Sequence, residues 1–211
     1  PVRYLLGVPG HYYSNEKYNR IAEMESLVDK YEDKTSTYLV KIASNNMSSK
    51  DSKAVTELLH CIGDIERISD HAVNIAKVAK EMFDKEVSFS EQAQKDIKVI
   101  TSASLEVLNM AVSSLINEDL SVARSVEPLE QVVDRLKRKI KSNHISRLKQ
   151  GDCTMELGFI LSDLLTNYER VADHCSNIAV CLIEIAHDSF ETHEYLSNVK
   201  NHNDQSFDEQ Y

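Results

Sequence analysis

The 211-residue sequence contains no tryptophan, only five glycines and only three prolines. Glycine and proline are the residues that most often interrupt regular structure, so their scarcity favours long helices over short elements joined by tight turns. The four cysteines form neither a CxxC pair nor a dense disulfide framework, and they lie at Cys61, Cys153, Cys175 and Cys181. We therefore expect reduced thiols in a cytosolic setting.

An excess of positive charge is also missing, because 34 acidic residues outnumber 24 basic ones and the net charge is -10. Nucleic-acid binding needs a basic surface, so this balance argues against a nucleic-acid partner and is compatible with cation binding. No uninterrupted apolar run approaches the roughly 20 residues that span a bilayer. Since the chain begins with Pro1 rather than Met, we interpret it as a fragment or a processed piece, and its parent protein can contain a membrane segment elsewhere.

Signatures of catalysis are absent as well. No nucleophile stands at a glycine-tight turn, and there is no phosphate-binding Walker loop and no dinucleotide-binding glycine motif. The sequence therefore predicts a protein that is not an enzyme.

Apolar residues at helical spacing predict five long helices, over about 14–44, 51–83, 90–117, 120–149 and 154–187. Ser14 and Ser90 are the expected N-caps, and Pro128 is expected to kink or break the fourth helix near its first third. The predicted buried stripes of the first two helices are Ile21, Met24, Val28, Tyr31, Thr35, Tyr38, Ile42 and Leu58, Ile62, Ile65, Ile68, Ala72, Ile75, Ala79, Met82.

A twelve-residue segment occurs twice in the chain. ERISDHAVNIAK at 66–77 and ERVADHCSNIAV at 169–180 share seven of twelve residues, at an offset of 103. A weaker echo precedes each copy: MESLVDKYEDK at 24–34 resembles LEQVVDRLKRK at 129–139. A long-range repeat indicates one structural unit used twice, and the polar character of the shared residues suggests two copies of one chemical site.

The two copies are unequal in length. Three predicted helices are available to the second copy, whereas only two belong to the first, so the first bundle is expected to lack its first helix. We therefore divide the chain into an irregular segment 1–14, a truncated first repeat 15–84, a second repeat 85–190 and a polar tail 191–211.

Each copy carries acidic residues four apart on two successive helices, which places each pair on one helix face. These candidate cation ligands are Glu25, Asp29, Glu66 and Asp70 in the first copy and Glu130, Asp134, Glu169 and Asp173 in the second. Oxygen ligands of this kind suit Mg, Ca, Mn or iron. The alternative is a salt-bridged face in which Arg67 and Arg170 each brace a neighbouring carboxylate. For His71 and His174 we favour hydrogen bonding over direct ligation.

The pattern ERxxDHxxNIA, found twice and each time preceded by a helix with ExxxD, resembles the PhoU domain. The resemblance implies an all-α fold of tandem antiparallel three-helix bundles related by a pseudo-twofold axis, with a role in regulating phosphate uptake. It also implies that the eight acidic residues hold multinuclear iron or zinc clusters on the bundle surface.

The segments LLHCIGDIERISDHAVNIA, VEPLE and LSDLLTNYERVADHCSNIAVCLIEI narrow the resemblance to the C-terminal cytoplasmic region of bacterial Na⁺/phosphate cotransporter family proteins. This implies a regulatory domain on the cytoplasmic side of the bacterial membrane, with the membrane domain of a phosphate transporter as its partner. The alternatives are a free-standing PhoU-type adaptor of a phosphate transporter or sensor kinase, and a structural helical scaffold without metal.

The predicted absence of one helix has a further consequence. The apolar stripes of the first repeat would face a groove that nothing in this chain fills, and exposed apolar surface of this kind favours self-association. We therefore expect either a homodimer formed through residues 1–83 or weaker protection of that half.

Overall fold

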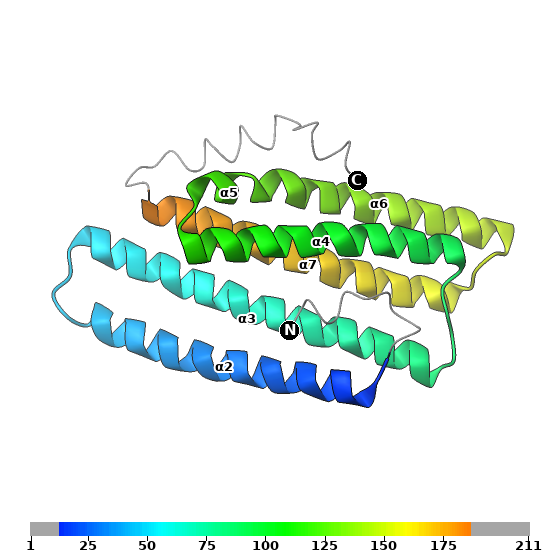
Figure 1. Cartoon of the computed structure of the whole chain (residues 1–211), viewed down its shortest axis with the longest axis horizontal. Coiled ribbons are helices and arrows are strands. Elements are labelled where there is room, and N and C mark those ends of the chain that lie inside the picture. The colour runs from blue at the N-terminus through cyan, green and yellow to red at the C-terminus, as the bar shows by residue number, and fades with distance from the viewer. Residues whose placement is uncertain (1–12, 187–211) are drawn as a thin grey trace.

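The computed structural model describes residues 13–186, and within this range every regular element is an α-helix (Figure 1). The predicted polar tail 191–211 and all but the last two residues of the predicted irregular segment lie outside the described residues. The helices are α2 (Asn15–Ala43), α3 (Ser49–Asp84), α4 (Glu91–Asn117), α5 (Leu120–Arg124), α6 (Val126–Gln150) and α7 (Met155–Ala186). The all-α prediction is confirmed, with helix ends within about two residues of those expected.

Short polar side chains set the helix starts. The Ser14 hydroxyl accepts a hydrogen bond from the Lys17 N–H at 3.2 Å, and the Ser90 hydroxyl accepts one from the Ala93 N–H at 3.4 Å, so both predicted caps are confirmed. Helix α3 begins slightly earlier than predicted because Ser48 is its cap, accepting from the Asp51 N–H at 3.1 Å. Gly151, with φ of 78°, ends α6 in the left-handed conformation that favours glycine.

The predicted break at Pro128 is present. The helix interrupts at Ser125, so that α5 ends at Arg124 and Pro128 lies in the first turn of α6. Proline has no N–H to donate to the Arg124 carbonyl one turn earlier, and the first turn is where a missing N–H is tolerated.

The helices form two groups that meet along one interface (Figure 1). Helices α4, α5, α6 and α7 pack into a bundle, while α2 packs on α3. Helix α3 lies along α7 and joins the two groups. This arrangement is the tandem of helical bundles that the sequence predicted, with two helices of the first repeat in the described part of the chain.

The core lies chiefly in the second repeat. Helices α4, α6 and α7 contribute side chains with almost no exposure, including Ile97, Ile100, Leu129, Leu164 and Tyr168. The Tyr168 hydroxyl lies in this core and accepts a hydrogen bond from the Thr101 hydroxyl at 2.9 Å. Complete burial raises the pKa of Tyr168 to about 12.

The predicted apolar stripes of the first repeat are partly wrong. Tyr31, Thr35 and Tyr38 of α2 are exposed, as are Leu58 and Ile65 of α3. Among the described helices, α3 is the one with which α2 makes substantial contact. In a three-helix bundle, two neighbouring helices would cover the apolar face of α2. In the C-terminal half of α2 the buried side chain is Leu39, which the predicted stripe did not include, and no second helix in the described residues covers Tyr31 and Tyr38.

Helix α4 is the one helix in residues 13–186 that is long and apolar enough to cross a membrane by length and composition alone. Its sequence contains no long uninterrupted apolar run, because Ser, Thr and Asn lie between its apolar residues. In the structure its apolar face packs against α6 and α7, as expected for a core helix of a bundle.

Candidate metal centre

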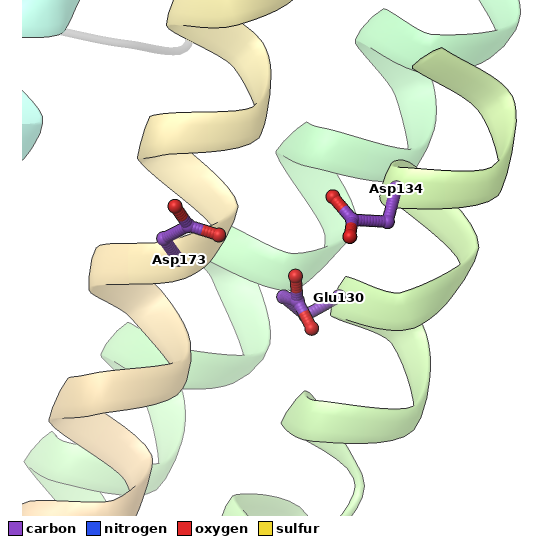
Figure 2. A group of neighbouring side chains, drawn as sticks. All are labelled: Glu130, Asp134 and Asp173. Atoms are coloured by element: carbon purple, nitrogen blue, oxygen red, sulfur yellow. The ribbon is translucent and has the colours of Figure 1, made fainter. Parts of the chain in front are cut away.

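Three of the four predicted ligands of the second repeat converge. Glu130 and Asp134 lie one turn apart on α6, and Asp173 faces them from α7 (Figure 2). One carboxylate oxygen from each residue lies within 4.8 Å of the other two. Glu130 is buried, and Asp134 and Asp173 are half-buried. The side-by-side packing of α6 and α7 therefore brings Asp173 next to two acids that lie 39 and 43 residues earlier in the chain.

The environment of Asp134 and Asp173 disfavours their charged forms. Burial raises the pKa of the Asp134 carboxyl above its ordinary value, and the neighbouring Glu169 carboxylate raises it further. Burial and Glu169 act in the same direction on the pKa of Asp173. Carboxyl groups with raised pKa values bind protons more readily, unless a cation occupies the cluster instead of the protons.

The fourth predicted ligand, Glu169, makes a different contact. Its carboxylate forms an ion pair with the Lys137 ammonium from α6, and both side chains are largely buried. Arg170 lies 3.2 Å from the Asp173 carboxylate, as the salt-bridge alternative predicted. The second repeat therefore shows both features at once, a cluster of three acids and basic groups at its edge.

Lys137 and Glu127 also belong to this site, although the sequence pattern did not predict them. Glu127 is buried, accepts a hydrogen bond from the Ser176 hydroxyl of α7, and shares the Gln131 side-chain amide with Glu130. Its signal was available, because Glu127, Glu130 and Asp134 follow the i, i+3, i+7 spacing of one helix face. The pairing of Lys137 with Glu169 had no such signal, since it depends on how α6 and α7 pack.

In the first repeat the predicted ligands are more spread out. Asp29 and Glu66 line an open cleft of about 700 Å³ between α2, α3 and α7, which also contains Glu32, Asp33 and Asp64. Among the described residues no three of Glu25, Asp29, Glu66 and Asp70 approach as closely as the acids of the second repeat. Arg67 lies 3.7 Å from the Glu66 carboxylate, again as the salt-bridge alternative predicted.

Two details of this cleft still point to a cation. One carboxylate oxygen of Asp29, Oδ1, is buried and has no hydrogen-bond partner in the protein. Burial and the adjacent Asp70 carboxylate raise the pKa of Glu66.

The repeated histidines connect the two repeats to each other. His71 Nδ1 lies 2.9 Å from the Asn167 side-chain oxygen, and His174 Nδ1 lies 2.7 Å from an Asp64 oxygen. Asn167 and Asp64 occupy equivalent positions, 103 residues apart like the histidines themselves. The two imidazole rings stack with centroids 5.6 Å apart. Both histidines therefore form hydrogen bonds in the structure, as we predicted in preference to metal ligation.

The donor set of the second repeat fits a hard cation. Metal–oxygen bonds of about 2.0–2.6 Å place ligand oxygens roughly 3–5 Å apart, which matches the separation of the three acids. Glu130, Asp134 and Asp173 would hold the ion, and Glu169 could join them if its carboxylate exchanged Lys137 for the metal. A bound cation would also relieve the repulsion that raises the pKa values of Asp134 and Asp173.

A family model matches most of the chain. The model of the PhoU domain matches residues 11–79 and 97–182, which include both copies of the motif.

Individual relatives agree with the family model. The chain is 25% identical over 168 residues to "Phosphate-specific transport system accessory protein PhoU homolog 1" of Thermotoga maritima, covering 79% of this chain and 71% of that protein. It is 23% identical over 163 residues to "Putative inorganic phosphate export protein YjbB" of Salmonella typhimurium, covering 75% of this chain but 30% of that protein.

Two solved structures share the fold. The crystal structure of PhoU from Pseudomonas aeruginosa superposes with a TM-score of 0.76 at 19% identity, covering 88% of this chain and 86% of the other. The crystal structure of the phosphate transport system regulatory protein PhoU from Streptococcus pneumoniae gives a TM-score of 0.70 at 18% identity, covering 82% and 81%.

Proposed function

Because this chain belongs to the PhoU family, we propose that it is an accessory regulator of a phosphate transport system, acting through binding rather than catalysis. The observation that carries this proposal is the family match over both repeats, each of which keeps the same polar motif. Its partner would be the membrane domain of a phosphate transporter, reached from the cytoplasmic face.

A domain of a Na⁺/phosphate cotransporter, which the sequence first suggested, is the second candidate. The match to the Salmonella export protein favours it, because this chain corresponds to 30% of a larger phosphate transport protein. The Thermotoga accessory protein is matched over 71% of its length, which supports the accessory regulator more strongly.

The test is phosphate uptake in cells that lack this chain. Uptake of radiolabelled phosphate would be measured in the deletion strain and its parent, at phosphate concentrations from scarce to abundant. We expect the dependence of uptake on external phosphate to change and to be restored by the wild-type gene. Identical uptake curves in the two strains would contradict a role in phosphate transport.

We further propose that Glu130, Asp134 and Asp173 bind a metal ion, with iron or zinc as the ions that the family resemblance implies. The converging oxygens and the raised pKa values of the two aspartates support it. Glu25, Asp29, Glu66 and Asp70 are the equivalent candidates in the first repeat, supported by the unpartnered Asp29 oxygen.

Elemental analysis of protein purified without chelator tests the metal directly. We expect bound iron or zinc, reduced by Asp134→Asn and unchanged by Asp152→Asn, which alters an exposed acid in the turn before α7. Equal metal content in the two variants would exclude the second-repeat centre. Metal-free protein whose thermal stability does not respond to added iron or zinc would favour the purely structural scaffold.

A further inference from the structure

The most basic segment of this acidic protein lies at one end of the bundle. Residues 135–150 contain seven Lys or Arg and no Asp or Glu, although the whole chain has a net charge of -10. This segment is the C-terminal part of α6, which runs into α7 at one end of the molecule (Figure 1).

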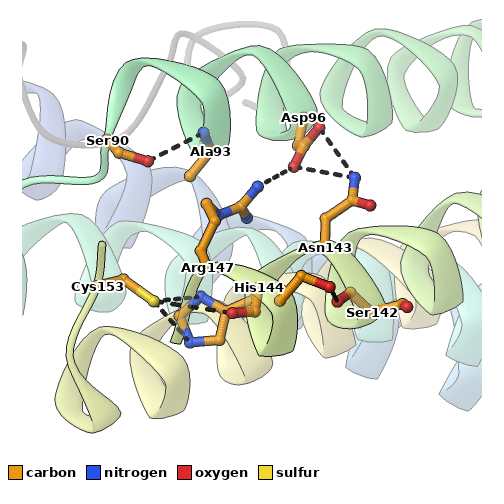
Figure 3. A network of polar contacts seen from close by, with 9 residues as sticks. Ser90, Ala93, Asp96, Ser142, Asn143, His144, Arg147 and Cys153 are labelled. Carbon is orange, nitrogen blue, oxygen red and sulfur yellow. Dashed lines mark hydrogen bonds and ion pairs between the residues drawn. The ribbon is translucent and has the colours of Figure 1, made fainter. Parts of the chain in front are cut away.

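Some of these basic residues are used inside the protein. Lys137 pairs with Glu169, and the buried Arg147 guanidinium donates to Asp96 at 2.8 Å (Figure 3). Asn143 lies 3.4 Å from both Asp96 oxygens, so α6 is held firmly against α4 on this inward face. The remaining basic residues are therefore presented on a rigid helix.

The outward face of the same segment combines basic and apolar side chains. Arg138, Lys141, Ile145 and Lys149 follow each other at spacings of three or four residues, which places them on one face of α6. Arg138 and Lys149 are exposed, Lys141 is half-buried, and Ile145 is 53% exposed.

Helix α7 extends this face with two further apolar side chains. Met155 is 64% exposed and Phe159 is 69% exposed, and they lie one turn apart. The two helices approach closely here, because a Cβ added to Gly158 would lie 2.7 Å from the His144 ring. A cavity of about 200 Å³ lies between them, lined by Lys141 and Ile145 of α6 and by Gly158 and Ser162 of α7.

We infer that this α6–α7 basic surface, formed by Arg138, Lys141, Ile145, Lys149, Met155 and Phe159, docks on an anionic membrane surface. The charges match, since the negative headgroups of an anionic leaflet attract Lys and Arg side chains that lie near the membrane surface. The exposed apolar side chains match as well, because peripheral proteins insert such residues at the boundary between headgroups and acyl chains.

Acidic neighbours offset part of this charge, because Asp134 lies one turn before Arg138 on α6 and the two charged groups interact. Glu156 pairs with Lys85 at 2.8 Å, on the side of α7 that faces α3. Asp152 is exposed in the turn between α6 and α7. The surface therefore keeps a positive balance.

Vesicle co-sedimentation of the purified chain tests the proposal independently of any effect on phosphate transport. The probe is a vesicle of phosphatidylcholine containing about 30% phosphatidylglycerol, compared with pure phosphatidylcholine, at low and high salt. We expect binding to the anionic vesicles alone, weakened by salt. The Arg138→Glu/Lys149→Glu variant should bind at least about tenfold more weakly, and Phe159→Ser about fivefold more weakly.

Lys53→Glu and Ile116→Ser are the matched controls. Both residues are exposed, and they lie in the first turns of α3 and the last turn of α4, at the opposite end of the bundle (Figure 1). Unchanged binding by these variants, with circular dichroism showing that all variants are folded, supports the assignment. Equal loss in the control and surface variants overturns it. Failure of wild-type protein to sediment with anionic vesicles also overturns it and leaves an acidic protein segment as the anion that fits this surface.

Discussion

Helices α3 and α7 carry the same motif, yet they sit in different surroundings. Leu161 of α7 is 1% exposed, whereas its equivalent 103 residues earlier, Leu58 of α3, is 36% exposed. Tyr168 is 0% exposed and hydrogen-bonds to α4, whereas its equivalent Ile65 is 38% exposed. The shared pattern specifies an apolar face, and the presence of α4 beside α7 decides whether that face is buried.

The acidic sites differ in a parallel way. Lys137 and Arg138 follow Asp134 in the second repeat, whereas Glu32 and Asp33 occupy the equivalent positions after Asp29. In the second repeat, three acids therefore converge next to the Lys137–Glu169 ion pair. In the first repeat, the residues that α2 contributes to the open cleft are all acidic. Both repeats keep the candidate ligands and an adjacent arginine, Arg67 or Arg170, whereas the charges at these two positions after Asp29 and Asp134 have opposite signs.

Truncation of the matched leucines should give the largest difference between the repeats. Leu161→Ala removes a fully buried side chain and should lower the free energy of unfolding by about 2–5 kcal/mol. Leu58→Ala should cost no more than about 1 kcal/mol, because its side chain already contacts water. Urea unfolding of both variants measures this, and equal losses would show that Leu58 is covered in solution.

Hydrogen exchange should show a smaller difference in stability between the repeats, but one that extends over whole helices. Amides of α2 should exchange roughly thirtyfold faster than those of α6, a difference of about 2 kcal/mol in opening free energy, since among the described helices α2 has substantial contact with α3 alone.

Equal protection of α2 and α6 would contradict this expectation for a monomer. Light scattering at several protein concentrations then decides the cause. A mass that doubles with concentration would show that a second copy covers α2, as the predicted homodimer requires.

Reversing one charge in each repeat tests the role of Lys137. Lys137→Glu adds a carboxylate beside Glu169 and Asp134 in a largely buried site, and should lower the free energy of unfolding by about 1–2 kcal/mol. Glu32→Lys introduces a cation into the open cleft and should change stability by less than about 0.5 kcal/mol. Thermal unfolding in chelator compares the two, and a loss in Glu32→Lys as large as that in Lys137→Glu would place the sensitive charge balance in the first repeat instead.

The smallest expected effect comes from Asp134→Asn in metal-free protein. The pKa of Asp134 is raised on folding, so ionisation destabilises the folded state as pH rises from about 4 through the folded pKa. The variant should therefore be about 0.5–1 kcal/mol more stable than wild type at pH 7 and equal to it near pH 3.

Unfolding curves between pH 3 and pH 8, with Asp152→Asn as the control, measure this difference. Excess iron or zinc should reverse the order, because only the wild-type cluster is stabilised by the ion. A variant less stable than wild type throughout, with chelator present, would mean that Asp134 is paired rather than repelled.

Local features of the chain were predictable from sequence. Ser14 and Ser90 cap helices because a hydroxyl before a helix satisfies a free N–H, and Pro128 breaks one because it has no N–H to give. The grouping of Glu130 with Asp134 on one face follows from helical spacing alone. Each of these depends on residues within about one turn of each other.

Other features were not predictable because they join distant residues. Tyr31 and Tyr38 are exposed because no described helix besides α3 packs substantially on α2, which their own spacing could not reveal. The pairing of Lys137 with Glu169 spans 32 residues, and that of His174 with Asp64 spans 110. No periodicity within one helix identifies such partners.

The amino-acid sequence by itself determined the helices, their ends, their apolar and acidic faces, and the existence of two equivalent copies. These follow from backbone geometry and from side chains a few residues apart. Only the tertiary structure decided which copy buries more of its apolar face and which three acids meet. It also decided that each repeated histidine bonds to the other repeat. Burial and ion pairing depend on the helices that pack nearby, and that packing is a property of the whole fold.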